Sequence, residues 1–195
     1  IAASSFGGMV YYTSPDRSEL LEQLQNQSIK ALCDADWKDL TIIRLPEIPT
    51  FNLLVGWTGQ VAITDSLIQE TEKKRKVATD SEFYKEFLKK SHAIVRGLQK
   101  AWNKQDIPAL QDGIRANRAL LNEFAQVMQL EIETPALQAL CDLAEQVGAC
   151  AKTSGAGGGD CGICFTQNEQ QRQQIENQWA KAQIQVLPLT IAEAW

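Results

Sequence analysis

The sequence has few of the residues and segments that mark metalloproteins, membrane proteins and nucleic-acid-binding proteins. It contains one histidine, and its only basic run, residues 73–76, is typical of a solvated helix end. No stretch approaches the roughly 20 consecutive apolar residues that a membrane-spanning helix needs, and no signal peptide is visible. Because the net charge is −5, we do not expect the chain to bind nucleic acid or a membrane.

The five cysteines predict reduced thiols in a cytoplasmic protein, because their number is odd and four of them lie in apolar segments. Two of them, Cys161 and Cys164, form a C-x-x-C motif. A redox motif of this spacing normally begins a helix, whereas the pattern here is that of a strand. A metal site would need more ligands, and His92 is far away in the sequence. We therefore predict neither a redox nor a metal role for the motif.

Composition and periodicity predict an α+β fold. The 195 residues, 44% hydrophobic and 22% charged, suit one large domain or two small ones. Strand-like segments near the start and long helical segments between residues 64 and 147 predict a small, mostly antiparallel sheet with helices packed on one face. A short proline-containing link joins segments 40–45 and 52–57, which we expect to pair as antiparallel strands. The other expected strands are 9–13, 149–152, 161–166 and 186–191, and the expected helices are 18–32, 64–77, a long helix opened by a capping box at 79–82, a helix capped by Asp106 that reaches Met128, 135–147 and 170–183.

A glycine-rich stretch, Lys152–Gly162, is the strongest functional signal. Four of the twelve glycines fall between Gly155 and Gly159. Glycine allows positive φ angles and lets backbone N–H groups crowd around an anion, while Thr153 and Ser154 add hydroxyl groups and Lys152 adds a charge. The stretch is neither a Walker A loop nor a dinucleotide-binding turn, because no Gly-Lys-Ser/Thr follows and the loop leads into a strand. We interpret it as a phosphate cradle; a flexible linker is the competing interpretation.

Two further polar residues lie in helical segments. Asn117 falls on the apolar stripe of its helix, between Ile114 and Leu121, and a polar group there needs a partner. That partner is either a hydrogen bond within the core or a ligand, and the spacing favours neither. His92 lies off the apolar stripe of its own helix, so we predict an ordinary surface histidine.

The glycine stretch, in the form Thr-Ser-Gly-Ala-Gly-Gly-Gly-Asp-Cys-Gly, resembles the third motif of the GHMP kinases. Residues 1–8, residues 54–59, and residues 114–121 with 133–135 resemble the phosphomevalonate kinase branch of that family. The resemblance covers nearly the whole chain. It implies that residues 1–195 form the C-terminal domain, with a ferredoxin-like core, of a two-domain enzyme. The N-terminal ATP-binding domain, absent from this chain, would be its partner.

The resemblance also implies an activity in the cytoplasmic mevalonate pathway of isoprenoid biosynthesis. The enzyme would transfer the γ-phosphoryl group of ATP, with Mg²⁺, to the phosphate of 5-phosphomevalonate, giving 5-diphosphomevalonate and ADP. Relatives carry a catalytic Asp directly before the position that matches Ile1, so this chain would contain no catalytic residue and would be inactive alone. The abrupt start at Ile1 suggests part of a longer polypeptide.

Carried over residue by residue, the resemblance assigns binding roles. Asn117 and Arg118 would face the acceptor, Arg118 with a bidentate grip on its phosphate. Trp57 and Thr58, followed by Gly59, would shape the acceptor pocket, and Ser4 would flank the missing Asp together with Ala3 and Ser5. The expected phosphate loop is Lys152, Thr153, Ser154, Gly155, Ala156, Gly157, Gly158, Gly159 and Asp160.

Several points stay open. Asp160 either orients the loop or caps a turn, and Thr64 either caps a helix or contacts the acceptor phosphate. Residues 60–63 depart from the family pattern, so acceptor contacts there are in doubt. Another GHMP kinase, such as a mevalonate kinase, is an alternative, although Trp57 and the pair Asp160-Cys161 favour the phosphomevalonate branch. A non-catalytic ferredoxin-like module that binds a small anion is a second alternative.

Overall fold

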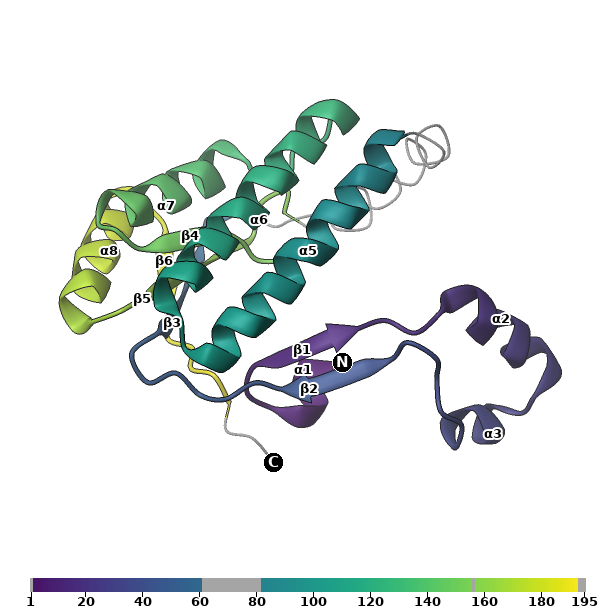
Figure 1. Ribbon diagram of the computed structural model, residues 1–195. Coiled ribbons are helices and arrows are strands. Elements are labelled where there is room, and N and C mark those ends of the chain that lie inside the picture. The colour runs from purple at the N-terminus through teal and green to yellow at the C-terminus, as the bar shows by residue number, and fades with distance from the viewer. Residues whose placement is uncertain (1, 61–81, 156, 193–195) are drawn as a thin grey trace. The chain divides into compact units, whose positions relative to one another are not determined.

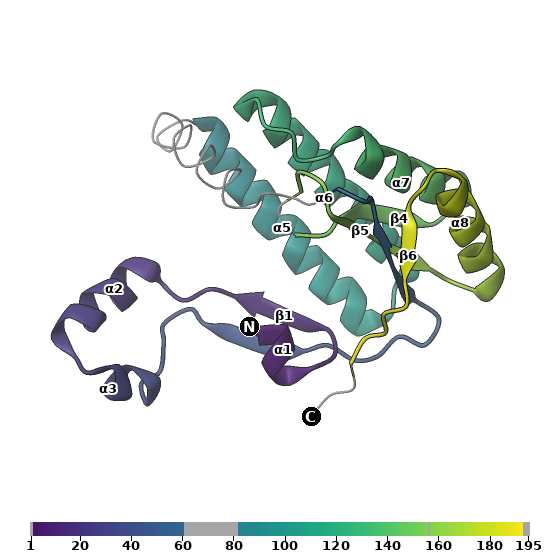
Figure 2. The same ribbon diagram turned by 180° about the vertical axis from the view of Figure 1, so that it is seen from behind.

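The computed structural model describes residues 2–60, 82–155 and 157–192. It divides the chain into two compact units: unit 1 is Ile1–Glu47 with Ile191–Trp195, and unit 2 is Ile48–Thr190. Figure 1 labels the helices and strands of both units, and Figure 2 shows the same ribbon from behind. The expected helix 64–77, with Thr64, lies outside the described residues, as do residues 79–81 of the expected capping box. Among the described helices, none is long and apolar enough to cross a membrane.

Unit 1 is built on an antiparallel pair of strands, β1 (Val10–Thr13) and β2 (Thr41–Arg44). Their register places Tyr12 opposite Ile42. The chain between the strands forms α2 (Arg17–Asn26) and α3 (Ile29–Cys33), and α1 (Ala2–Phe6) precedes them (Figure 1). The predicted strands at 9–13 and 40–45 are confirmed; the short helix α1 was not expected from the sequence.

The predicted single helix 18–32 is wrong, because the chain breaks between α2 and α3. Gln27 has extended backbone angles and ends the first helix. Ser28 then caps the second, where its hydroxyl accepts a hydrogen bond from the N–H of Ala31 at 3.2 Å. A serine in this role satisfies one of the free N–H groups of a helix start, so Ser28 begins a new helix.

The predicted pairing of segments 40–45 and 52–57 is also wrong. β2 pairs with β1, whereas β3 (Asn52–Trp57) belongs to the sheet of unit 2. Two prolines in the link, Pro46 and Pro49, restrict the backbone and cannot donate hydrogen bonds. The link carries the chain into unit 2, where Ile48 and Phe51 are buried.

Unit 2 contains a four-stranded antiparallel sheet in the order β4-β5-β3-β6. Its other strands are β4 (Cys150–Thr153), β5 (Cys161–Thr166) and β6 (Gln185–Leu187). Helices separate β3 from β4 and β5 from β6, so the chain follows the β-α-β-β-α-β path of ferredoxin-like folds. The expected fold class is therefore confirmed. The last strand is shorter than expected, because Pro188 follows Leu187 and cannot extend the ladder.

Two helices, α7 (Pro135–Gln146) and α8 (Glu169–Lys181), pack on the sheet (Figure 2). Leu140 lies so close that a Cβ added to Gly56 or Gly162 would come within 2.8 Å or 2.6 Å of its side chain. Trp179 is fully buried, and its indole N–H donates to the carbonyl of Leu140 at 3.0 Å. The missing side chains of both glycines thus allow helix and sheet to pack closely. The buried residues of this core cluster are Leu54, Leu140, Cys141, Ala144, Ala149, Ala151, Cys164, Ile175, Trp179 and Ile184.

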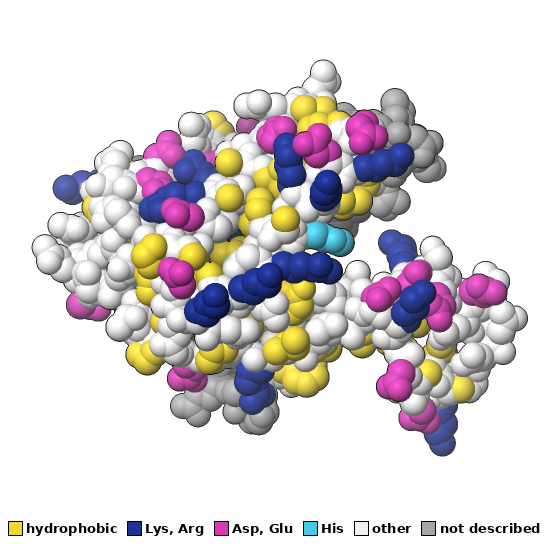
Figure 3. Space-filling model, viewed as in Figure 1, with side chains coloured by type: hydrophobic (Ala, Val, Ile, Leu, Met, Phe, Trp, Pro, Cys, Tyr) yellow, Lys and Arg dark blue, Asp and Glu magenta, His cyan; other side chains and the backbone are white. Residues whose placement is uncertain are grey.

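A long helix pair, α5 (Glu82–Lys104) and α6 (Ile107–Met128), accompanies the sheet, and α6 lies along β4. Asp106 caps α6 as predicted, accepting a hydrogen bond from the N–H of Ala109 at 3.1 Å. His92 on α5 is exposed, as predicted, and the single histidine is visible at the surface in Figure 3. On the same face, acidic and basic side chains are interspersed.

Candidate functional site

The predicted phosphate loop joins β4 to β5 as the connection of a hairpin. The N–H of Ser154 donates to the carbonyl of Cys161 at 2.9 Å and closes the hairpin. Gly155, Gly157 and Gly158 have φ angles of 75°, 80° and 80°. Side chains rarely tolerate such angles, so this backbone path requires glycine at these positions. The loop is therefore a shaped turn and not a linker.

One end of the loop is fixed to the segment that follows β3. The N–H of Asp160 donates to the carbonyl of Gln60 at 2.7 Å, and the carbonyl of Asp160 accepts from the N–H of Thr58 at 2.9 Å. Asp160 itself has a φ of 60°, a left-handed conformation that Asp tolerates better than most residues. Asp160 thus orients the loop through its backbone, and the structure brings it together with Thr58.

The other side of the loop rests on the connection between α6 and α7. The N–H of Gly158 donates to the carbonyl of Ile132 at 2.8 Å. A Cβ added to Gly157 would lie 2.2 Å from that carbonyl oxygen, closer than any side chain can approach. The loop is therefore held by backbone hydrogen bonds at two places, Thr58 on one side and Ile132 on the other, and both contacts set its conformation.

The three side chains at the start of the loop, Lys152, Thr153 and Ser154, differ in their exposure to solvent. Lys152 is half-buried, and its ammonium donates to the carbonyl of Thr153 at 2.7 Å. Burial lowers the pKa of Lys152, and no carboxylate among the described residues forms an ion pair with it. The hydroxyl of Thr153 is buried and makes no hydrogen bond with the described residues, whereas Ser154 is exposed. Ser154 is therefore the accessible hydroxyl of the two expected donors.

Arg118 is already engaged by carboxylates. Its Nε lies 2.9 Å and 3.1 Å from the two carboxylate oxygens of Glu133, and its Nη2 contacts both Glu133 and Asp142, the latter at 2.8 Å. Burial of the guanidinium disfavours its charged form, but the hydrogen bonds to Glu133 and Asp142 outweigh this and raise the pKa of Arg118. The guanidinium of Arg118, for which the family resemblance implies a bidentate contact with the acceptor phosphate, thus makes a bidentate contact with Glu133 in this structure.

Asn117 lies one turn before Leu121 on the apolar stripe of α6, as predicted, and is half-buried. Its amide makes no hydrogen bond with another residue in the described ranges. The structure therefore supplies no core partner for it there, which leaves the ligand interpretation standing.

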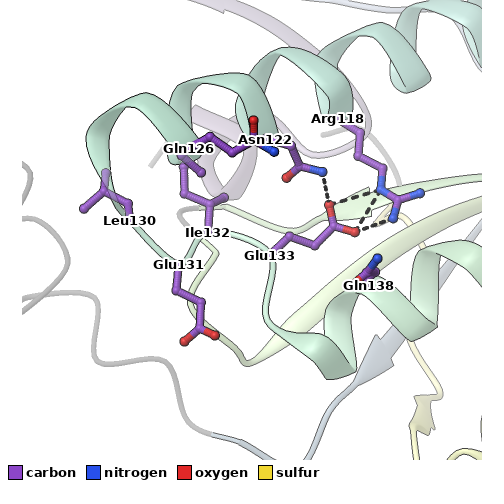
Figure 4. A pocket seen from close by; sticks show the side chains of 9 residues that line it. Arg118, Asn122, Gln126, Leu130, Glu131, Ile132, Glu133 and Gln138 are labelled. Carbon is purple, nitrogen blue, oxygen red and sulfur yellow. Dashed lines mark hydrogen bonds and ion pairs between the residues drawn. The ribbon is translucent and has the colours of Figure 1, made fainter.

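A cavity of about 330 Å³ lies beside Arg118 (Figure 4). Glu133 faces both Arg118 and Asn122, and the amide of Asn122 donates to its carboxylate. Sequence reasoning missed the roles of Glu133 and Asn122. A usable signal was the position of Asn122, four residues after Arg118 and hence on the same face of the helix. The lining residues are Arg118, Asn122, Ala125, Gln126, Leu130, Glu131, Ile132, Glu133 and Gln138.

The remaining predicted site residues have different settings. Trp57 is half-buried at the end of β3, opposite Cys161 on β5. Ser4 is exposed on α1 of unit 1. Ala156 and Thr64 lie outside the described residues.

The C-x-x-C motif spans the two faces of β5. Cys164 belongs to the core cluster beneath α7 and α8, and Cys161, three residues away, points to the opposite face. All five thiols are free. Within the described ranges, no three His, Cys, Asp or Glu residues come together as a metal site would require.

Comparisons with known proteins identify the family. Residues 94–185 match the family model "GHMP kinases C terminal". The chain contains a GHMP kinase C-terminal domain. The match spans α6, α7, the glycine loop and the sheet strands β4 and β5, which are the elements that build the loop.

Three known proteins are similar to nearly the whole chain. The chain is 37% identical to the phosphomevalonate kinase of Streptomyces sp. (strain CL190), over 98% of the chain and 51% of that protein. A crystal structure of the Lin0012 protein from Listeria innocua has a TM-score of 0.93 and 32% identity, over all of this chain and 54% of that one. The Streptococcus pneumoniae phosphomevalonate kinase in complex with phosphomevalonate and AMPPNP has a TM-score of 0.79 and 27% identity, over 92% of this chain and 51% of that one. The chain thus spans about half the length of these relatives.

Proposed function

We propose that this chain is the C-terminal portion of a phosphomevalonate kinase, which transfers the γ-phosphoryl group of ATP to 5-phosphomevalonate in the mevalonate pathway. The observation that carries the proposal is the glycine loop between β4 and β5, fixed at Thr58 on one side and at Ile132 on the other. The similarity to the Streptomyces kinase supports the choice of acceptor. The N-terminal half of such a kinase is the partner we propose.

The proposed reaction is an in-line displacement at phosphorus. A phosphate oxygen of 5-phosphomevalonate forms a bond to the γ-phosphorus of ATP while the bond from that phosphorus to the β–γ bridging oxygen breaks, so that ADP leaves. Little covalent chemistry falls to the protein, which positions the two anions and stabilises the charge on the transferring oxygens. Backbone N–H groups aimed at that charge are effective because their dipoles are already oriented.

The loop N–H groups differ in their hydrogen bonds, which supports a division of roles among them. The N–H groups of Ser154, Gly158 and Asp160 donate to carbonyls and hold the loop. The N–H groups of Gly155 and Gly157 donate to no backbone carbonyl of the described residues, and we assign them, with the Ser154 hydroxyl and the Lys152 ammonium, to the phosphates. We assign Asn117, Trp57 and Thr58 to the acceptor side and Ser4 to the vicinity of the reacting groups.

The Mg²⁺ that accompanies ATP does not fit a site built by this chain alone. In the described ranges the only loop carboxylate is Asp160, whose Oδ1 accepts a weak hydrogen bond from the Cys161 thiol. Mg²⁺ usually keeps several waters and binds one or two carboxylates together with substrate phosphates. The described residues thus supply at most a small part of its coordination shell.

The test is a substrate panel on the complete protein that carries this chain. ATP-dependent ADP formation is measured with 5-phosphomevalonate, mevalonate, homoserine and galactose, and the product is identified by ³¹P NMR. We expect 5-phosphomevalonate to give the highest kcat/KM and a product with a diphosphate signal. Preferential use of mevalonate would contradict the proposal and favour a different GHMP kinase.

The non-catalytic alternative makes a different prediction. An anion-binding module would bind inorganic phosphate in calorimetry with this chain alone, and the complete protein would form no ADP with any acceptor of the panel. We expect the opposite: the chain alone is inactive, and the complete protein turns over.

A further inference from the structure

We infer that Glu133, gripped by Arg118, is a positioning residue that fixes the α6–α7 connection and, through Ile132, the conformation of the glycine loop. Arg118 is then a partner of Glu133 and not a ligand of the acceptor. The kinetic part of this inference rests on the proposed function, whereas its structural part does not.

The first step is the dependence of the loop on Ile132. The carbonyl of Ile132 accepts the N–H of Gly158 at 2.8 Å, and the Ile132 backbone occupies the space where a Cβ of Gly157 would lie. A shift of this carbonyl by a few tenths of an ångström would therefore change both contacts. The loop N–H groups can stabilise charge only if they are held in place before the reaction.

The second step is what holds Ile132. The next residue, Glu133, has a side chain with only 6% of its surface exposed. Its two oxygens accept hydrogen bonds from Arg118 and Asn122, both on α6 (Figure 4). Thr134 then caps α7 through the N–H of Leu137. The side chain of Glu133 thus holds the connection against α6, and the cap formed by Thr134 joins it to α7. Ile132 lies directly before Glu133.

The third step is the charge balance of the cluster. The guanidinium of Arg118 forms ion pairs with two carboxylates, those of Glu133 and Asp142, and Glu133 is the more buried of the two. A buried carboxylate that loses its cation is strongly unfavourable, so the chain around it rearranges. Loss of Arg118 is therefore expected to displace Glu133, and with it the neighbouring Ile132.

A second ion pair of α6 offers a control. Arg115 on α6 contacts Glu145 on α7, with Nε to Oε2 at 2.8 Å and Nε to Oε1 at 3.0 Å. This pair also involves an arginine of α6 and a glutamate, but Glu145 lies near the end of α7, whereas Glu133 lies in the connection before α7, next to Ile132. Its loss should loosen the helix pair without moving the loop.

The experiment compares Glu133→Ala and Glu133→Gln with Glu145→Ala and Glu145→Gln in the complete protein. Hydrogen exchange is followed by mass spectrometry in peptides that cover residues 153–161. The values of kcat and of KM for ATP and for 5-phosphomevalonate are measured at a temperature where each variant is fully folded by circular dichroism. The Gln variants keep the volume of the side chain, so they remain informative should an Ala variant fail to fold.

We expect Glu133→Ala to speed exchange in the loop peptides at least tenfold and to lower kcat at least tenfold, with Glu133→Gln intermediate. The Glu145 variants should change both by less than twofold. Unchanged loop exchange in folded Glu133 variants, or equal effects of the Glu133 and Glu145 variants, would overturn the inference.

Arg118→Ala separates positioning from acceptor binding. Positioning predicts faster loop exchange and a similar loss with respect to ATP and acceptor. A selective rise in the KM for 5-phosphomevalonate with unchanged loop exchange would show instead that Arg118 binds the acceptor. If the wild-type protein forms no ADP with 5-phosphomevalonate, the proposed function fails, and the exchange measurements still decide the positioning role.

Discussion

Thr58 donates two hydrogen bonds to the carbonyl oxygen of Asp160, one from its backbone N–H and one from its hydroxyl, each 2.9 Å long. This double contact fastens the end of the glycine loop to the end of β3. The sequence placed Thr58 beside the acceptor, and the structure adds that its hydroxyl helps to set the position of the loop.

Replacing Thr58 by Val should therefore loosen the loop. Val keeps the shape and the backbone hydrogen bond but loses the hydroxyl donor, at a cost of about 0.5–1.5 kcal/mol in the free energy of unfolding. Urea unfolding measures this change, and Thr58→Ser, which keeps the hydroxyl, is the control. Destabilisation by Ser but not by Val would show that the methyl group, and not the hydrogen bond, is what matters.

Gly157→Ala should damage the loop much more than Gly155→Ala. Both positions have positive φ, which costs an Ala about 1–2 kcal/mol. Only at Gly157 would the new Cβ also collide with the carbonyl oxygen of Ile132, whereas nothing lies within 4 Å at Gly155. In the complete protein we expect Gly157→Ala to lower kcat roughly 100-fold, the loss typical of one misplaced oxyanion donor. A steady-state assay in which both variants lose the same activity would contradict the role of the Ile132 contact.

The five thiols should react in a defined order. Burial raises the pKa of Cys141 and of Cys150 to about 12, and that of Cys164 as well. Burial, together with the neighbouring Asp160, also raises the pKa of Cys161, whereas Cys33 is exposed. With iodoacetamide at pH 8, mass spectrometry should find Cys33 alkylated first, Cys161 more slowly, and the other three only after unfolding, because only the thiolate reacts. Early alkylation of Cys164 would show that the core beneath α7 and α8 opens readily.

Lys152 should make stability depend on pH. Burial lowers its pKa from 10.5, so between the lowered value and 10.5 the unfolded chain binds more protons than the folded one. The contribution of Lys152 to the free energy of unfolding therefore rises with pH through this window and is smallest below it. Lys152→Met removes this dependence, and all other groups are the same in both proteins. Urea unfolding at several pH values from 7 to 10 should show an advantage of the Met variant that shrinks as the pH rises; a constant difference would contradict the burial of the charge.

The helices of unit 2 were predictable because their signals are local. Asp106 and Thr134 occupy cap positions directly before periodic apolar segments, and each caps its helix in the structure. The partner of β2 was not predictable in this way. β1 reaches it only after two helices, and nothing within residues 40–45 favours β1 over β3 as a partner.

In the candidate site, too, features with a local sequence signal were predictable, whereas features that depend on distant contacts were not. Glycine content located the loop, because few other residues adopt its backbone angles. The direction of the Thr153 hydroxyl was missed, although strand alternation places Thr153 on the same face as Ala151 in the core. The role of Glu133 depends on contacts with α6 and, through Ile132, with the loop, and no sequence spacing encodes three segments meeting in space.

Asn117 gives a prediction that links stability to function. It is half-buried on the apolar stripe of α6, and its amide has no hydrogen-bond partner in the described ranges. A leucine at this half-buried position would bury additional apolar surface on the stripe, so Asn117→Leu should raise the free energy of unfolding by about 1 kcal/mol. If Asn117 binds the acceptor, its replacement should impair activity even though it does not lower stability. We therefore expect the KM for 5-phosphomevalonate to rise at least tenfold in the complete protein, with the KM for ATP nearly unchanged.

The control for this prediction is Asn122→Leu on the same helix. Asn122 donates to the buried carboxylate of Glu133, so its replacement removes a hydrogen bond to a charged group and should lower the free energy of unfolding by about 1.5–3 kcal/mol. Opposite signs for the two asparagines would separate a ligand-binding amide from a structural one. Destabilisation by Asn117→Leu, with normal use of 5-phosphomevalonate, would instead contradict the ligand role and assign Asn117 to the packing of α6.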